Sequence, residues 1–315
     1  MARVLDEVDL AVVGALQVDG RASWRRIARA IGIPVSTVTR RGTLLLESGM
    51  VRVAALRIFA DTLIVEVATT PTTERAVAEL LAGSDDSIFV YVMSPDRHVL
   101  AEVAVDSSGH DFVAGQALAA LPGVTSVVAT PAIEYYRTVT EWMPGLISTE
   151  SARAVRSTFG RPPQRGRPPA DQVDEAIIAA LVADGRAPIE TVAALAGVSE
   201  SSARRRMAVL LGRTIDVRAI VDPADVGLPV SALVKLAVPP AAMAEMAGAL
   251  RVLPEVRYAV LTTGAFQLLV DVTLPSVEAL RDIVTGAGWS APATRIDSAL
   301  VVTAYKRGGV AVSVG

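Results

Sequence analysis

The feature that most constrains this chain is an internal repeat. Residues 6–54 align without gaps on residues 171–219, and the double arginine at 40–41 meets the one at 205–206. An Asp-Gly-Arg-Ala stretch and a serine four residues before the double arginine also occur in both copies. Repetition of this extent is the mark of a duplicated structural unit, so the chain is expected to contain the same domain twice.

Each copy has the spacing of three short helices. In the first copy, the apolar positions of residues 5–16 share one helical face, and the pattern stops at the turn signal Asp19-Gly20. A second short helix over 24–31 ends at Gly32, before a third helix. Two helices, a glycine-containing turn and a further helix are the order of a helix-turn-helix domain, in which the last helix reads DNA.

The third helix, residues 35–48, has an exposed face suited to a DNA groove. Val38, Gly42 and Leu45 recur on one face, while short hydroxyl side chains and arginines fall largely on the other. Hydroxyls and guanidinium groups bond to phosphates and base edges. A surface helix with solvated arginines is the alternative. The repeat favours DNA contact, because a solvated face would not require the same serine and arginines twice.

The predicted DNA contacts are polar positions on these helices and two arginines nearby. They are Arg25, Ser36, Thr37, Thr39, Arg40 and Arg52 in the first copy, and Ser201, Ser202, Arg204 and Arg205 in the second. Arg41 and Arg206 face the protein and are interpreted as partners of an acidic residue instead. Residues 50–58 are expected to form a short extended segment or a wing beside the phosphates.

Charge along the chain supports this prediction for the first copy. The net charge is −3, yet residues 1–57 hold nine arginines against five acids and residues 143–170 hold five against one. Residues 58–142, by contrast, hold three basic residues against twelve acids. A local basic surface is expected of a protein that binds DNA through one region only. The second copy is slightly acidic and is expected to bind more weakly.

Two further regions have the periodicity of αβ sandwiches. In the first, strands are predicted at 63–68, 87–93, 99–105 and 124–136, with helices at 72–81 and 112–121. In the second, strands are predicted at 230–238, 256–263, 266–273 and 293–305, with helices at 240–251 and 275–286. The β-α-β-β-α-β order is the ferredoxin-like unit.

The fold class is therefore α+β, with two winged helix-turn-helix domains alternating with two ferredoxin-like βαββαβ domains. The predicted segments are helix-turn-helix domains at 1–57 and 171–219, sandwiches at 58–142 and 220–307, a Pro/Arg-rich linker at 143–170 and a tail at 308–315. The linker holds five prolines and is expected to form no core.

Composition excludes several classes of protein. The chain has no cysteine and two histidines, which excludes disulfides and thiolate zinc sites. No apolar run approaches the roughly 18 residues of a membrane span, and the charged opening MARVLDEVDL is unlike a signal peptide, so the expected location is cytoplasmic. Neither a nucleophile–base pair nor a phosphate-binding loop is present, so neither enzyme activity nor a cofactor is expected.

The motifs together resemble the Lrp/AsnC (feast/famine) family of bacterial and archaeal transcription regulators. Leu5 with Asp6 and Asp9 gives an opening LD-x-x-D, and it is followed by the DGR turn, S-x-x-x-RR, and PGV at 122–124. The second copy has Ala170 in place of the leucine and lacks PGV. The resemblance implies DNA binding by the helix-turn-helix, and dimerisation and amino-acid sensing by the sandwich, which is called the RAM domain.

In family members of ordinary length, two chains pair through their sandwiches. The resemblance thus implies that this tandem chain folds as its own pseudo-dimer with two unlike readers, suited to an imperfect palindrome of double-stranded DNA. Further association into a homodimer or a larger homo-oligomer is also expected.

The family's sensing motif, G-x-x-D between the second and third sandwich strands, is altered in both copies. The second keeps Gly264 but has Gln267 in place of the Asp, and the first has Pro95 and His98. A small-molecule effector such as an amino acid, another metabolite, or no effector is left open, and the altered motif favours the last two over a free amino acid. The candidate effector-binding residues are Ser94, Asp96, His98, Thr263, Gly264 and Gln267. A half-buried structural role is the alternative for His98.

The linker contains a short motif of its own. Arg165, Gly166 and Arg167, followed by a proline, match the core of an AT-hook, which inserts into a narrow minor groove. A plain basic spacer that attracts phosphates is the alternative.

Two other functions remain as alternatives to a regulator. An architectural DNA-binding protein would show a steep salt dependence with little preference among sequences. Paired chains of this architecture also resemble sirohaem decarboxylases, which act on a bound tetrapyrrole, and Arg97, His98 and His110 are the residues available for such an enzyme.

Overall fold

The structure is a computed structural model that describes residues 5–59, 61–95, 98–105, 118–156 and 171–312. The chain forms two compact units. Residues 1–60 and 143–226 make the first, here called the helical unit. Residues 61–142 and 227–315 make the second, called the sheet unit. Both helix-turn-helix segments thus lie in one unit and both sandwich segments in the other.

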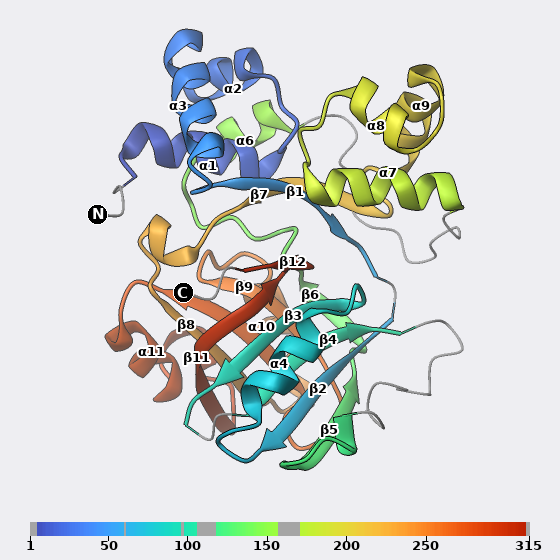
Figure 1. Ribbon diagram of the computed structural model, residues 1–315. Helices are drawn as coiled ribbons and strands as arrows, with labels where there is room; N and C mark the ends of the chain where they lie inside the picture. The colour runs from blue at the N-terminus through green and yellow to red at the C-terminus, as the bar shows by residue number, and fades with distance from the viewer. Residues whose placement is uncertain (1–4, 60, 96–97, 106–117, 157–170, 313–315) are drawn as a thin grey trace. The chain divides into compact units, whose positions relative to one another are not determined.

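The helical unit contains two three-helix modules of the same design (Figure 1). The first module consists of α1 (Glu7–Val18), α2 (Trp24–Ile31), α3 (Val35–Glu47) and β1 (Arg52–Arg57). The second consists of α7 (Gln172–Ala183), α8 (Ile189–Leu195), α9 (Glu200–Leu210), β7 (Ile215–Ile220) and the short η1 (Pro223–Val226). Asp6 and Asp171 cap α1 and α7 by accepting backbone N–H bonds of the first turn.

The two modules are joined by a pair of strands, one from each module. β1 and β7 pair antiparallel, with Arg52 opposite Ile220 and Arg57 opposite Ile215. Each strand packs against the first helix of the other module, β1 against α7 and β7 against α1 (Figure 1). The segment at 50–58 is extended, as predicted, and its backbone groups also join the two modules.

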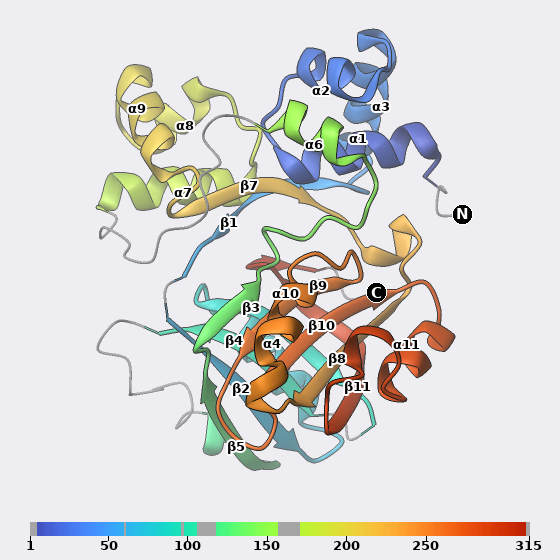
Figure 2. The ribbon, with the colours of Figure 1, turned by 180° about the vertical axis from the view of Figure 1, so that it is seen from behind.

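Part of the predicted linker is structured. Residues 149–155 form α6 (Thr149–Val155), and its side chains Ala152 and Val155 are buried. α6 packs against α1 and α2 (Figure 2), and Leu146 lies so close to Gly14 that a Cβ there would be 2.8 Å from the leucine Cβ. The expectation that 143–170 forms no core is thus wrong for residues 143–156. Residues 157–170 lie outside the described part of the chain.

The sheet unit is built from two halves. The first half has β2 (Thr62–Thr69), α4 (Glu74–Ala82), β3 (Ser87–Met93), β4 (Val99–Ala104), β5 (Val124–Pro131) and β6 (Glu134–Arg137). The second has β8 (Val230–Ala237), η2 (Pro240–Ala242), α10 (Met243–Leu250), β9 (Val256–Leu261), β10 (Leu268–Leu274), α11 (Val277–Val284), η3 (Gly288–Ser290), β11 (Arg295–Arg307) and β12 (Val310–Ala311).

These elements confirm the α+β class. The second half has the complete β-α-β-β-α-β order, whereas most of the helix predicted at 112–121 lies outside the described residues. The tail predicted at 308–315 is not loose throughout, because β12 pairs with the end of β11.

The strands of the two halves pair in the same register. Residues 62–103 align without gaps on 231–272. Phe89 in β3 lies opposite Glu102 in β4, and the equivalent residues Tyr258 and Asp271 lie opposite each other in β9 and β10. The sheet unit is therefore duplicated like the helical unit, although fewer of its residues are identical.

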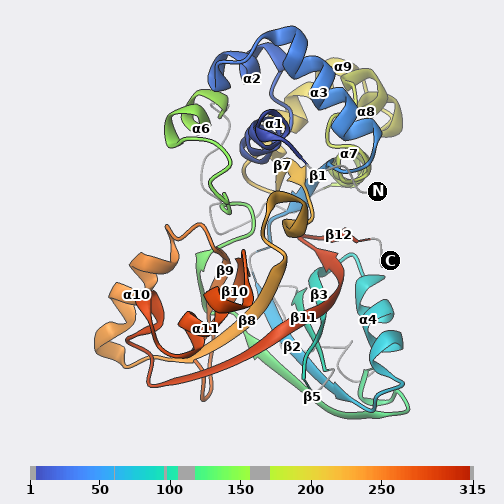
Figure 3. The same cartoon turned by 90° about the vertical axis from the view of Figure 1, so that its left-hand side faces the viewer.

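The last strand of each half pairs with a strand of the other half. The continuous sheet has the order β5-β2-β4-β3-β11-β8-β10-β9-β6. The long strand β11 pairs with β8 of its own half over 295–300 and with β3 of the first half over 301–306 (Figure 3). In the same way, β5 pairs with β2 of its own half, and the following β6 pairs with β9 of the second half.

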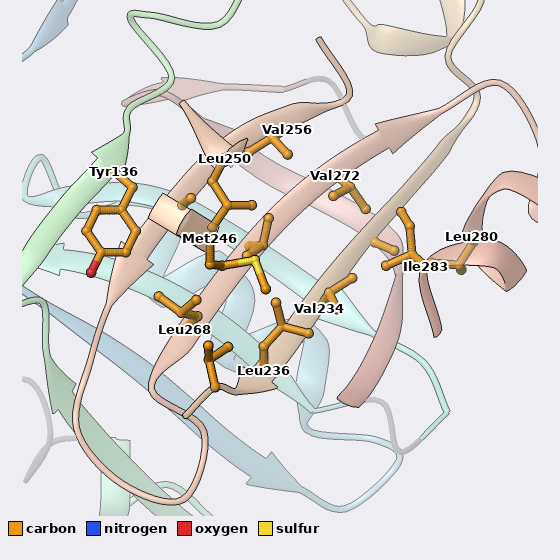
Figure 4. Close-up of a cluster of buried hydrophobic side chains, with 14 of the residues drawn as sticks. Tyr136, Val234, Leu236, Met246, Leu250, Val256, Leu268, Val272, Leu280 and Ile283 are labelled. Atoms are coloured by element: carbon orange, nitrogen blue, oxygen red, sulfur yellow. The ribbon is translucent and has the colours of Figure 1, made fainter. Parts of the chain in front are cut away.

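The exchanged strands also carry side chains into the opposite core. Tyr136 of β6 is 7% exposed and packs in the second half among Met246, Leu250 and Leu268 (Figure 4). Its equivalent, Tyr305 of β11, packs against the core of the first half. A third buried cluster mixes residues of both halves. The halves therefore share apolar surface and stabilise each other.

Close backbone contact at the β1–β7 ribbon gives the first prediction. A Cβ on Gly20 would lie 2.9 Å from both the Val217 carbonyl oxygen and the Arg218 Cα. We expect Gly20→Ala to lower the free energy of unfolding by about 2 kcal/mol, since overpacked backbone must shift. Gly248 in α10 has nothing within 4 Å of a Cβ and is the control. Gly248→Ala should be neutral or stabilising in the same urea titration, and equal effects of the two would contradict the packing account.

Candidate nucleic-acid interface

The two reader helices, α3 and α9, present the predicted polar face to solvent. Ser36 and Arg40 are exposed on α3, and Thr37 and Thr39 are half-buried. On α9, Ser201, Arg204 and Arg205 are exposed and Ser202 is half-buried. The opposite faces are buried, through Val38, Gly42 and Leu45 in α3 and through Ala203, Met207 and Leu210 in α9. The structure thus gives both helices the amphipathic form that groove binding requires.

The double arginine divides into an outward and an inward side chain. Arg41 Nη2 lies 2.7 Å from Asp6 Oδ2, and Nη1 lies 3.2 Å from Asp9 Oδ2, whose side chain is 1% exposed. Arg206 forms the equivalent pairs with Asp171 at 2.7 Å and Asp174 at 2.8 Å. The interpretation of the second arginine as the partner of an acid is confirmed. It ties the reader helix to the first helix of its module.

These ion pairs also account for the repeated aspartates. The hydrogen bond from the Asp9 amide, with the nearby Arg41 charge, lowers the pKa of Asp6. The amide of Asp174 and the hydrogen bond from Arg206 likewise lower the pKa of Asp171. Each aspartate therefore serves both as a helix cap and as an anchor for the reader.

The arginines of β1 are engaged within the helical unit. Arg52 Nη2 donates to the Val182 carbonyl of α7 at 3.0 Å, and Arg57 pairs with Glu175 at 2.6 Å. The structure places Arg52, a predicted DNA contact, at the junction between the modules, where the residue is exposed. Arg25, at the start of α2, is exposed.

A reciprocal pair of arginines links the two modules, and sequence reasoning missed it. Arg21 donates from Nη1 to the Gly185 carbonyl at 2.5 Å and from Nη2 to the Ala187 carbonyl at 3.1 Å. Arg186 donates from Nη1 to the carbonyls of Gly20 at 2.5 Å and Ala22 at 3.2 Å. We call these contacts the arginine clamp. The signal was the repeated Asp-Gly-Arg, which was interpreted only as a turn.

The clamp is half-buried and has an aromatic neighbour. Burial lowers the pKa of both Arg21 and Arg186. The Arg186 guanidinium lies 4.4 Å from the ring centroid of Trp24, and the same ring packs so closely on Gly42 that a Cβ would be 2.4 Å from it. The clamp therefore connects the second module to the helix α3 of the first through one tryptophan.

The candidate effector residues lie in equivalent turns of the two halves of the sheet unit. Ser94 and His98 are half-buried between β3 and β4, and the Ser94 amide donates to Leu300 at 2.9 Å. Thr263 and Gly264 are exposed between β9 and β10, and Gly264 has φ +101°. These residues remain candidates.

The side chain of Gln267, another effector candidate, forms a hydrogen bond within the sheet unit. The Gln267 side-chain oxygen accepts a hydrogen bond from the Val238 amide at 3.2 Å. The remaining candidate, Asp96, lies outside the described residues, as do Arg97 and His110 of the decarboxylase alternative. The AT-hook candidate, Arg165, Gly166 and Arg167, also lies outside them.

The described ranges of the chain also bear on membrane spans and metal sites. Within them, no helix is long and apolar enough to cross a membrane. No cluster of three or more potential metal-ligating side chains occurs among these residues either.

Comparison with known proteins decides the family. A model of the AsnC-type helix-turn-helix domain matches residues 5–43 and 171–211, and one of the Lrp/AsnC ligand-binding domain matches 231–311. An uncharacterized HTH-type transcriptional regulator of Pyrococcus furiosus is 32% identical over 110 residues, which are 33% of this chain and 74% of that protein. The chain belongs to the Lrp/AsnC family.

A second relative of this Lrp/AsnC protein supports the assignment. The HTH-type transcriptional regulator FL11 of Pyrococcus horikoshii is 29% identical over 120 residues, which are 38% of this chain and 80% of that protein. The chain is accordingly a transcription regulator with helix-turn-helix DNA-binding domains and a Lrp/AsnC ligand-binding domain. Two matches to the helix-turn-helix model confirm its tandem form.

A solved structure resembles nearly the whole Lrp/AsnC chain. The sirohaem decarboxylase NirDL has a TM-score of 0.61 at 11% identity, over 96% of this chain and 93% of that one. A second structure of NirDL, in complex with an iron-uroporphyrin III analogue, has a TM-score of 0.62 at 12% identity, over 98% and 94% of the two chains. At this identity the likeness concerns the fold alone.

The divided roles of the double arginine give a second prediction. Arg41→Ala removes the ion pairs to the exposed Asp6 and the buried Asp9, and the loss of the buried partner should cost about 3 kcal/mol of stability. Arg40→Ala, its exposed neighbour, should change stability by less than about 0.5 kcal/mol and weaken DNA binding by about 1–3 kcal/mol. Thermal unfolding and DNA titration of both variants measure this, and a stable Arg41→Ala protein would refute the anchoring role.

The arginine clamp gives a third prediction. Arg186→Ala should lower the free energy of unfolding by about 2 kcal/mol, because buried carbonyls lose a charged donor. Arg186→Lys should recover little of it, since an ammonium lacks the planar set of donors. Arg21→Ala should be milder, because only Arg186 lies over Trp24. Chemical denaturation followed by tryptophan fluorescence tests the order, and full recovery by lysine would contradict the geometry.

Proposed function

We propose that this regulator binds an imperfect palindrome as a single chain, with α3 on one half-site and α9 on the other. The observation that carries the proposal is the junction of the helical unit, where β1 pairs with β7 and the arginine clamp closes in both directions. The junction supports two readers in a fixed relation, as in a dimeric helix-turn-helix protein. The half-sites would then lie one helical turn of DNA apart or a multiple of it.

The residues proposed to contact DNA are the exposed polar positions of the readers. Arg40 in α3, and Arg204 and Arg205 in α9, can donate two bonds to a guanine edge. Ser36 and Ser201, near the helix N-termini, would bond to phosphates, where N–H groups of the first turn also point. Thr37, Thr39 and Ser202 are proposed to contact DNA at the rims of these helices.

The two modules would contribute unequally. Around the first reader, α2 exposes Arg25 and Arg29, whereas α8 exposes Glu190 at the position equivalent to Arg25. Phosphate attraction depends on local positive charge. The first module is therefore proposed to supply most of the salt-dependent affinity, and the second to refine the choice of site.

The sheet unit is proposed to sense a metabolite other than a free amino acid. Gln267 replaces the aspartate of the family motif, and its side chain already accepts a bond from the Val238 backbone. Thr263 and Gly264 remain exposed beside it. This unit is proposed to act as a sensor without catalysis.

The first experiment is recovery of sheared genomic DNA by the purified protein at physiological salt, followed by sequencing. Sharp peaks that share an imperfect palindrome would support the proposal. Enrichment that follows only A·T content would instead favour an architectural protein and a contribution from the linker.

Alanine variants of the two readers then give a fourth prediction. On the recovered operator, Arg40→Ala should reduce the slope of log affinity against log salt by about 1 and weaken binding to one half-site. Arg205→Ala should act on the other half-site, with a smaller loss of affinity. Footprinting of both variants checks this assignment, and protection lost equally from both half-sites would contradict it. A Soret band in the purified protein would instead revive the decarboxylase alternative.

A further inference from the structure

The two halves of the sheet unit meet through side chains that occupy equivalent positions. Glu66 in β2 aligns with Lys235 in β8, since both strands have the same register toward their neighbours β4 and β10. Lys235 Nζ donates to Glu66 Oε2, and the two side chains are 23% and 32% exposed. A contact between equivalent positions must lie at the approximate two-fold axis that relates the halves.

In any pair of halves related by such an axis, a residue that lies on the axis contacts the equivalent residue of the other half. If two first halves were paired in the same way, Glu66 would face a second Glu66. If two second halves were paired, Lys235 would face a second Lys235. Like charges placed directly opposite each other destabilise a pair of sheets, whereas this chain has opposite charges there.

A second contact between the halves also depends on a side chain that only one half has. Phe89 and Tyr258 are equivalent and touch, with ring centroids 5.7 Å apart. The Tyr258 hydroxyl donates to Glu102 Oε1 at 3.0 Å, and Glu102 is 1% exposed. In a pair of first halves, Phe89 would stand in the place of Tyr258. The buried carboxylate would then lose this donor, and a lost partner for a buried carboxylate is costly.

A third contact, from Tyr91 of the first half to Asp271 of the second, also depends on a side chain that only one half has. Asp271 is the equivalent of Glu102 and is 2% exposed. Tyr91 of the first half donates its hydroxyl to Asp271 Oδ2 at 3.2 Å. The residue equivalent to Tyr91 is Val260, whose side chain has no hydrogen-bond donor. A pair of second halves would therefore also leave a buried carboxylate without this hydroxyl.

We propose that the two halves are a matched pair, in which each mating face accepts the other half of the chain and excludes a second copy of itself. Three contacts enforce the match, Glu66 with Lys235, Glu102 with Tyr258, and Asp271 with Tyr91. A further copy of the chain cannot join either face by pairing like with like. Ordinary-length relatives, which pair identical chains, do not replace one half unless their faces carry the complementary groups.

The test builds each forbidden pairing inside the intact chain. Lys235→Glu with Tyr258→Phe gives the second half the face of the first at two positions. We expect its melting temperature to fall by about 5 °C or more, and that of Lys235→Glu alone by about half as much. Glu66→Lys with Tyr91→Val gives the first half the face of the second at two positions. The melting temperature of this variant should also fall by about 5 °C or more. These measurements need no DNA, so their outcome is independent of the proposed operator.

Two controls separate matching from loss of a contact. Lys235→Gln removes the attraction without creating repulsion, so its melting temperature should lie clearly above that of Lys235→Glu. The exchanged variant, Glu66→Lys with Lys235→Glu, restores opposite charges and should recover to within about 2 °C of the parent. Raised salt should narrow the difference between the glutamate and glutamine variants.

The outcomes that overturn the proposal are equally specific. If the Lys235→Glu variant melts at the same temperature as the Lys235→Gln variant, like charges are tolerated at the axis and the proposal is wrong. An exchanged variant no better than either single variant would show that the pair is not reciprocal. If Lys235→Glu alone fails to fold while the glutamine and exchanged variants fold, the exclusion is upheld in its strongest form.

Discussion

Backbone pairing between the two copies is the constraint on which the rest of the structure depends. In the helical unit, β1 and β7 satisfy each other's hydrogen bonds, and in the sheet unit β6 and β11 cross into the opposite half. A strand separated from its partner would leave buried backbone groups unpaired, which is unfavourable. Neither copy of either domain is therefore complete alone, and each depends on the other for its backbone hydrogen bonds.

Equivalent residues of the repeat have two different kinds of role. Some keep one role in both copies, as the arginine clamp does through Arg21 and Arg186 and the inward arginines do through Arg41 and Arg206. Others differ, as Glu66 and Lys235 do, and meet across the axis as complements. A homodimer can have only the first kind, because its equivalent residues are identical. A single chain with two copies can also have equivalent positions occupied by different, complementary residues.

The inward and outward roles of neighbouring arginines show how a module couples packing to recognition. Arg41 is held by two aspartates and fixes α3 on α1, which leaves Arg40 exposed on the same helix. An exposed side chain on a rigid helix is more useful for reading DNA than one on a loose helix, because less rotational freedom is lost on binding. In the proposed binding mode, the acidic caps thus support the reader helix without touching DNA.

The sequence by itself determined the duplication, most of the helix and strand order, the α+β class, the family, and the inward direction of Arg41 and Arg206. These follow from local periodicity, turn residues and motif spacing, which depend on near neighbours in the chain. Only the tertiary structure decided that residues 50–58 join the modules, that α6 packs on the first module, that the last strands are exchanged, and that Arg21 and Arg186 form a clamp. Each of these is a contact between segments distant in sequence, and a strand or an arginine has the same local pattern whether its partner is solvent, DNA or another part of the chain.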